Sequence, residues 1–178
     1  TAVGTIMYTQ LCNEHGGIEC DLTMLRTAPD SWYVVTGAAF GAHDMGWIRS
    51  NSPDDGSVVF RDLTSARAVI NLCGPLSRDV LQSVSEDDVS SAAFPYGQAR
   101  EITVGSAPVL AMRIGYTGEL GWELHIPTEY AAHVYELLRA AGEPPGIVDA
   151  GHRTIDPMRM EKGYLYWSPD ITPDTTPW

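Results

Sequence analysis

Two acidic residues lie where side chains can do chemistry, each shortly after a glycine-bearing turn. Asp21 belongs to the stretch NEHGGIECDL, and Glu123 closes the stretch GYTGELGWE. Glycines in such turns adopt positive φ angles easily and let the backbone approach a ligand closely. A carboxylate beside the turn can orient a nucleophile or carry a proton. It can also accept two adjacent N–H donors of a flat ligand in bidentate fashion.

Both residues also have an interpretation without chemistry, and spacing alone leaves both interpretations open. Glu123 fits a solvent-facing residue of an ordinary hairpin, and Asp21 fits a turn-capping aspartate. A third candidate, Arg159, is flanked by two methionines and is predicted to emerge from a partly buried surface. It can pair with a carboxylate or stack on an aromatic ring. The alternative is an ion pair with Asp156 within one helix.

The elements that must position these residues are mostly short strands with helices between them. Alternation and turn signals predict strands at residues 6–12, 18–26, 31–37, 57–62, 66–73, 98–104, 109–114 and 121–126. Apolar periodicity predicts helices at 38–50, 76–84, 128–141 (with Thr128 as N-cap) and 150–161. This order favours an α+β fold, mainly antiparallel sheets with flanking helices. The order strand–strand–helix occurs over 6–50 and again over 66–141, which suggests two similar halves.

Composition narrows the classes of partner. The chain has 178 residues, 44% hydrophobic and 19% charged, which suits a globular domain with a sizeable core. Its formal net charge is −12, from 23 acidic and 11 basic side chains. Because such a field repels phosphate, we expect neither nucleic acid nor an anionic membrane as a partner.

The cysteines and histidines show no metal-ligand spacing. Three cysteines give an odd count without a secretory pattern, so we expect reduced thiols rather than a disulfide between Cys12 and Cys20. The five histidines are scattered, and we expect no metal. The expected compartment is cytoplasmic, or the mitochondrial matrix in a eukaryote.

Five stretches in the right order resemble the folate-binding domain of the aminomethyltransferase family, the glycine-cleavage T-protein. They are residues 13–24, 32–48, 70–82, 113–127 and 155–167, and they look most like the version fused to dimethylglycine and sarcosine dehydrogenases. The resemblance implies a folate-binding domain over 1–167, with N- and C-terminal parts of the family module missing. It also implies a Pro-rich connection over 168–178 to an absent C-terminal domain.

What the resemblance implies about function is carried over residue by residue. Asp21 matches the acid near the reacting folate nitrogens, although the family often has two acids there and this chain has Cys20 before it. Glu123 matches the glutamate that grips the pterin ring, Tyr116 lines the pocket, and Arg159 lies near the folate. We therefore expect Asp21 and Glu123 to face one cavity wide enough for a pteridine.

The implied reaction uses tetrahydrofolate and a small methylated amine donor, and gives 5,10-methylenetetrahydrofolate. Any FAD site is expected in an absent domain of the same parent protein. Three alternatives stay open. One is a folate-binding relative in iron–sulfur maintenance, disfavoured because Tyr164 follows Lys162-Gly163 where that branch has Cys. The others are a demethylase of methylated sulfur compounds, and a truncated, catalytically inactive folate-binding or scaffolding domain.

Overall fold

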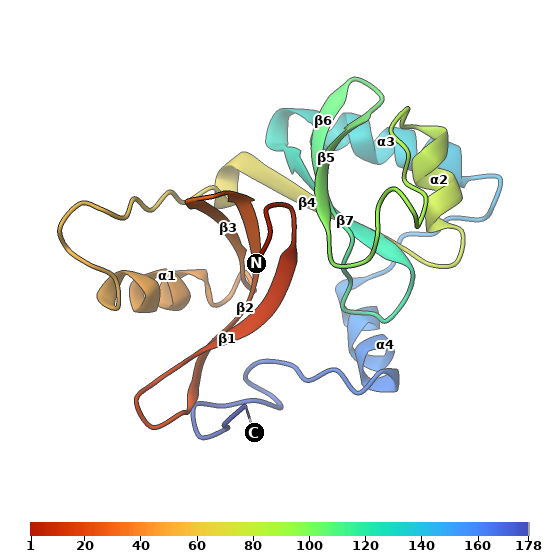
Figure 1. Cartoon of the computed structure of the whole chain (residues 1–178). Coiled ribbons are helices and arrows are strands. Elements are labelled where there is room, and N and C mark those ends of the chain that lie inside the picture. The colour runs from red at the N-terminus through yellow and green to blue at the C-terminus, as the bar shows by residue number, and fades with distance from the viewer. Residues whose placement is uncertain (178) are drawn as a thin grey trace. The chain divides into compact units, whose positions relative to one another are not determined.

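A computed structural model of the chain describes residues 1–177, so that Trp178, the end of the predicted connection, lies outside the described residues. The chain divides into two compact units. The first comprises Thr1–Asp62 and the residues from Leu165 onward, and the second comprises Leu63–Tyr164. Each unit contains an antiparallel sheet and at least one α-helix, which confirms the α+β prediction (Figure 1).

The first unit is built on a three-stranded sheet in the order β1-β2-β3. Its strands are β1 (Ile6–Cys12), β2 (Ile18–Ala28) and β3 (Ser31–Val35), followed by helix α1 (Gly41–Ser50). Burial alternates along the start of β2, where Cys20 and Leu22 are buried and Glu19 and Asp21 are half-buried. This alternation was predicted, because successive side chains of a strand point to opposite faces.

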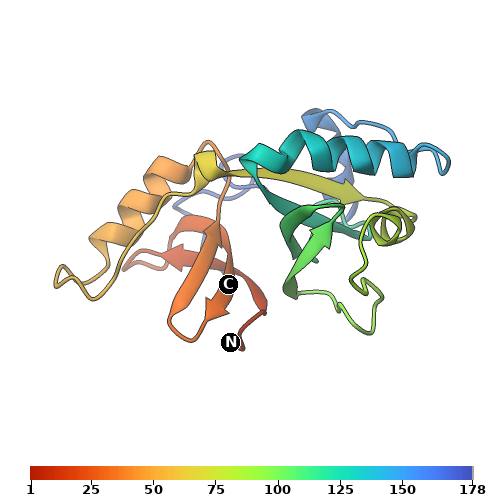
Figure 2. The ribbon, with the colours of Figure 1, turned by 90° about the horizontal axis from the view of Figure 1, so that it is seen from above.

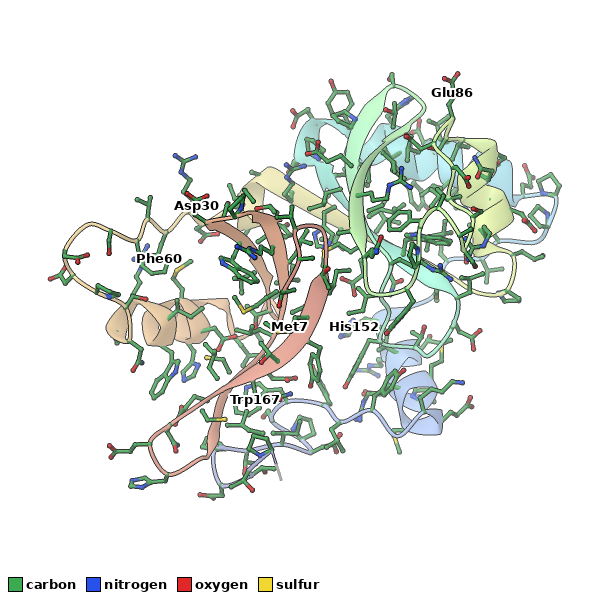
Figure 3. All side chains as sticks on the ribbon, viewed as in Figure 1. Met7, Asp30, Phe60, Glu86, His152 and Trp167 are labelled. Carbon is green, nitrogen blue, oxygen red and sulfur yellow. The ribbon has the colours of Figure 1, made fainter. Side chains whose placement is uncertain are left out.

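The Pro-rich C-terminal segment packs against the first hairpin. The Ile18 amide donates to the Thr175 carbonyl at 3.0 Å, and Ile171 is buried. Trp167, labelled in Figure 3, makes an edge contact with Phe40 at a centroid distance of 6.3 Å. The segment predicted as a connection is thus docked on its own unit over its described residues.

The second unit has four antiparallel strands in the order β4-β7-β6-β5. The strands are β4 (Arg67–Cys73), β5 (Ala99–Val104), β6 (Ala107–Met112) and β7 (Gly121–Pro127). The helices are α2 (Ser77–Ser83), α3 (Ala131–Gly142) and α4 (Ile155–Glu161), with short 3-10 turns at Thr64–Ala66, Thr128–Tyr130 and His152–Thr154. Figure 2 shows α3 lying along this sheet.

The core of the second unit fills the space between one face of the sheet and helices α2 and α3. Trp122, Leu124 and Ile126 of β7 are fully buried there, with Leu81 of α2 and Val134 of α3 packed against them. Because alternate residues of β7 are committed to this core, the residues between them must point to the opposite face of the sheet.

Three sequence predictions are wrong in detail. Residues 57–62 form no strand: Val59 is 77% exposed, and no described strand pairs with this run. Thr128 is not an α-helical N-cap, because its hydroxyl donates to the Ser65 carbonyl and α3 begins at Ala131. The suggested repeat is also absent from the topology, since β4 pairs with β7 rather than with the next strand.

Within residues 1–177, no helix combines the length and apolar character needed to cross a membrane.

Candidate functional site

Glu123 lies in the middle of β7, opposite Asn71 of β4 and Met112 of β6. Its side chain is 25% exposed, and its Oε2 lies 3.7 Å from Nε2 of His125, whose side chain is 1% exposed. Residues i and i+2 of a strand share a face, so these two side chains project together from the face opposite the core. Glu123 is therefore a half-buried carboxylate with a buried imidazole beside it.

This environment differs from the solvent-facing alternative and from a purely apolar setting. Trp122 and Leu124, which flank Glu123 in sequence, point into the core on the other face of the sheet. The local polar neighbour of the carboxylate is His125 instead. The alternation of side chains along β7 was sufficient to place Glu123 and His125 on one face of the sheet. The burial of His125 was not evident from the sequence.

The turn before Glu123 packs against the end of α4. The rings of Tyr116 and Tyr164 are stacked, with centroids 6.1 Å apart and planes inclined by 17°. Gly118 has a φ of +72°, and the space where its Cβ would lie is filled by the Lys162 side chain, with Cγ at 2.1 Å. A residue with a side chain would therefore both strain this turn and displace Lys162. The glycine-rich turn around Tyr116 and the segment after α4 thus pack directly against each other.

Arg159 is buried and holds this structure together from the helix side. Its Nε donates to Oδ1 of Asp156 at 3.0 Å, which is the ion pair that the sequence offered as the alternative to a ligand contact. Its guanidinium also donates through an NH group to the Tyr164 carbonyl at 2.9 Å. Arg159 therefore connects α4 to the residue whose ring stacks on Tyr116.

Asp21 lies on β2 of the first unit, directly opposite Gln10 of β1. Its Oδ1 accepts a hydrogen bond of 3.0 Å from the Gln10 side-chain amide, and the residue is half-buried. The preceding Cys20 is buried on the other face of the strand. Only one of the two neighbouring side chains, that of Asp21, is thus presented on the open face. Whether Asp21 and Glu123 act on one ligand stays a prediction.

A cavity lies in each unit. That of the second unit, about 330 Å³, includes most of the predicted turn and is lined by Tyr96, Arg113, Gly115, Gly118, Glu119, Leu120, Gly121 and Tyr164. That of the first unit, about 440 Å³, is lined by Gln10, Leu11, Cys12, Trp47, Ile48, Asn51 and Ser52. Neither cavity is lined by Asp21 or Glu123. The cavity of the second unit includes Gly121, which is close to Glu123 in sequence, and that of the first unit includes Gln10, which donates to Asp21.

Sequence reasoning missed a polar cluster in the first unit. Cys20 of β2 lies beside His43 and Asp44 of α1, and Asp44 is 2% exposed although it carries a carboxylate. Burial raises the pKa of the Cys20 thiol to about 12, and the neighbouring Asp44 carboxylate adds to this effect. All three cysteines are free, as predicted. No sequence signal marks the cluster, since its members come from different elements.

Comparison with known proteins gives the chain a family. The model of the GCVT N-terminal domain matches residues 1–178. Mitochondrial sarcosine dehydrogenase of Mus musculus is 36% identical over 188 residues, covering 98% of this chain and 20% of that protein. Aminomethyltransferase of Halothermothrix orenii is 36% identical over 174 residues, covering 98% of this chain and 48% of that protein.

A solved structure agrees with these sequence relatives. The crystal structure of glycine cleavage system aminomethyltransferase T from Bartonella henselae matches with a TM-score of 0.80 and 27% identity. The match covers 99% of this chain and 45% of that one, so the chain spans about half the length of the aminomethyltransferases and a fifth of the dehydrogenase. The chain belongs to the GCVT N-terminal domain family, with the aminomethyltransferase fold.

Proposed function

We propose that the chain binds tetrahydrofolate and serves one-carbon transfer from a small methylated amine, giving 5,10-methylenetetrahydrofolate. The observation that carries the proposal is the half-buried carboxylate of Glu123, which lies on the face of β7 opposite the core, beside a buried imidazole. A carboxylate in this setting requires a partner, because burying an ionised group without one is costly. Membership of a family that includes an aminomethyltransferase supports the same conclusion.

Glu123 is assigned to the pterin ring. A pterin offers an amino group beside a ring N–H, and a carboxylate accepts that fork through its two oxygens. Nε2 of His125 lies 3.7 Å from Oε2 on the same face of β7. The stacked ring of Tyr116 gives a flat aromatic neighbour in the turn that precedes β7. In this assignment Arg159 acts by holding Tyr164, and through it Tyr116.

Asp21 is assigned to the reacting nitrogens as the group that orients them and manages a proton. The Gln10 amide fixes one carboxylate oxygen and leaves the side chain half-buried on the open face of the sheet. Tetrahydrofolate supplies the nucleophilic nitrogen when bound, so this chain needs no Ser or Cys nucleophile. Orientation contributes up to roughly 7 kcal/mol in favourable cases, and a positioned acid–base group about 10²- to 10⁴-fold in rate.

We propose that the oxidation of the amine takes place in another part of the whole protein. In a dehydrogenase-like parent, FAD would bind in another domain and would accept the electrons when the methylated amine is oxidised. The other parts of the same protein would be the partners of this domain. The mouse relative is named as a mitochondrial enzyme, which supports a matrix location if this protein is eukaryotic.

The alternative is a domain that binds folate without turnover or serves only as a scaffold. This alternative must be tested because the chain covers only part of each relative. A titration with folinic acid, a stable reduced folate, followed by fluorescence of the five tryptophans, separates a folate-binding domain from a scaffold, and product analysis in the whole protein then separates turnover from binding alone. A saturable change supports the proposal, whereas no change up to millimolar folinic acid would leave only the scaffold.

A further inference from the structure

The polar cluster of Cys20, His43 and Asp44 has the composition and spacing of a metal site. One ligand atom of each residue (thiol sulfur, imidazole nitrogen and carboxylate oxygen) lies within 4.8 Å of the other two. The separation of His43 Nδ1 and Asp44 Oδ1 is 3.0 Å. Ligand atoms of one tetrahedral zinc ion are about 3.3–3.6 Å apart, given metal–ligand bonds of about 2.0–2.3 Å. Small side-chain rotations would bring the three onto one ion.

Burial makes a cation favourable at this position. Cys20 and Asp44 are 0% and 2% exposed, so an ionised Asp44 is almost completely removed from water. Among its described partners, the Thr36 hydroxyl and the Cys20 thiol are neutral donors, and only His43 can carry a positive charge. A buried carboxylate is expensive without a positive partner. A divalent cation would supply that charge to the carboxylate and to a thiolate together.

The groups around the cluster already orient its members. Thr36 donates to Oδ2 of Asp44, which leaves Oδ1 directed at His43. On the other side of the imidazole, Glu19 Oε2 lies 3.9 Å from His43 Nε2, and the Asn13 amide fixes the other oxygen of Glu19 at 2.8 Å. Ligating histidines commonly have a carboxylate on their second nitrogen, which fixes the tautomer. This arrangement assigns Nδ1 of His43 to the metal.

We propose that the first unit binds a divalent cation of the zinc type through Cys20 Sγ, His43 Nδ1 and Asp44 Oδ1. Binding releases the thiol proton to solvent, and water completes the tetrahedron on the side of His43, whose side chain is 52% exposed. The ion would tie β2 to α1. None of its ligands has a role in folate binding, so the proposal does not depend on the proposed function.

The test uses Co²⁺ as a spectroscopic substitute for Zn²⁺ on the full chain. The exposed thiols are removed first in the double variant Cys12→Ser/Cys73→Ser, so that Cys20 is the remaining thiol. We expect one equivalent of Co²⁺ to bind, with a sulfur-to-cobalt band in the near ultraviolet and visible bands of a tetrahedral ion, and Zn²⁺ to displace it. Absence of the sulfur-to-cobalt band in this background would overturn the proposal.

Single variants in the same background assign the ligands. His43→Gln, at a half-exposed position that tolerates substitution, is expected to weaken Co²⁺ binding by about tenfold or more, and the exposed His15→Gln is its matched control. Cys20→Ser should abolish the near-ultraviolet band, with its fold checked by circular dichroism. Unchanged affinity in His43→Gln, or a band that survives Cys20→Ser, would reduce the cluster to a set of hydrogen bonds.

Discussion

The rings of Tyr116 and Tyr164 stack at a centroid distance of 6.1 Å, which joins the glycine-rich turn before Glu123 to the segment after α4. The two residues come from motifs far apart in the sequence, and Arg159 holds one of them through its backbone carbonyl. The second unit therefore brings Tyr116 and Arg159, both predicted as folate-site residues, into one connected set of contacts.

Removing the stacked ring should loosen this structure. Tyr164→Leu is expected to lower the free energy of unfolding by about 0.5–1.5 kcal/mol, the usual contribution of an aromatic pair beyond its buried area. Tyr164→Phe keeps the ring and should behave like the unaltered chain. Urea unfolding monitored by fluorescence measures both, and equal losses in the two variants would assign the effect to the hydroxyl.

Two glycines of the first unit should respond to alanine in opposite directions. A Cβ on Gly17 would lie 2.0 Å from the Pro173 carbonyl oxygen, so Gly17→Ala must displace the docked C-terminal segment. We expect a loss of about 1–3 kcal/mol and faster proteolysis after residue 167. Gly46 of α1 has open space at that position, so Gly46→Ala should stabilise by about 0.5–1 kcal/mol. Similar unfolding curves for the two variants would contradict the packing of residues 168–177.

In the metal-free chain, the Cys20 thiol should make stability depend on alkaline pH. Its pKa is about 12 in the folded chain against an ordinary value of 9.0, so between these values the unfolded chain releases a proton that the folded chain retains. Stability attributable to this group is therefore complete below pH 9 and falls as pH rises toward 12, by at most about 1.4 kcal/mol per pH unit. Urea unfolding across this range should show a steeper loss for the unaltered chain than for Cys20→Ala. Parallel losses would show that the thiol ionises equally in both states.

The fold was predictable where the pattern is local. The hairpin of β1 and β2 and the pair β6 and β7 follow from alternation and turn glycines, and the face of α3 with Val134 and Leu138 follows from helical periodicity. The strand predicted at residues 57–62 was wrong. An apolar segment becomes a strand only where a neighbouring strand accepts its hydrogen bonds, and the sequence does not reveal that neighbour.

The candidate residues of the site could be named from the sequence, whereas their contacts could not. Asp21, Tyr116, Glu123 and Arg159 could be named from motifs, whereas the stack on Tyr164 and the buried His125 depend on which elements meet. The cluster at Cys20 was missed for the same reason, because its ligands come from a strand and a helix whose packing is set by tertiary structure.

Asp21 should matter for turnover more than for binding. In the protein that contains this chain, Asp21→Asn is expected to lower kcat by about 10²- to 10⁴-fold while folinic acid still binds, because the amide keeps the shape but cannot manage a proton. Asp30→Asn, at the exposed turn between β2 and β3, is the control (Figure 3). Normal turnover in Asp21→Asn would remove this residue from the mechanism.

The most direct test of the folate assignment is calorimetric titration of the chain with folinic acid, comparing Glu123→Gln with Glu101→Gln at an exposed position of β5. Glutamine retains the size of Glu123 beside His125 but cannot accept both N–H groups of a pterin. We predict a single binding site whose affinity falls in Glu123→Gln by about 1.5–3 kcal/mol, roughly 10- to 150-fold in Kd, and is unchanged in Glu101→Gln. Equal affinity in Glu123→Gln and the unaltered chain would contradict the account.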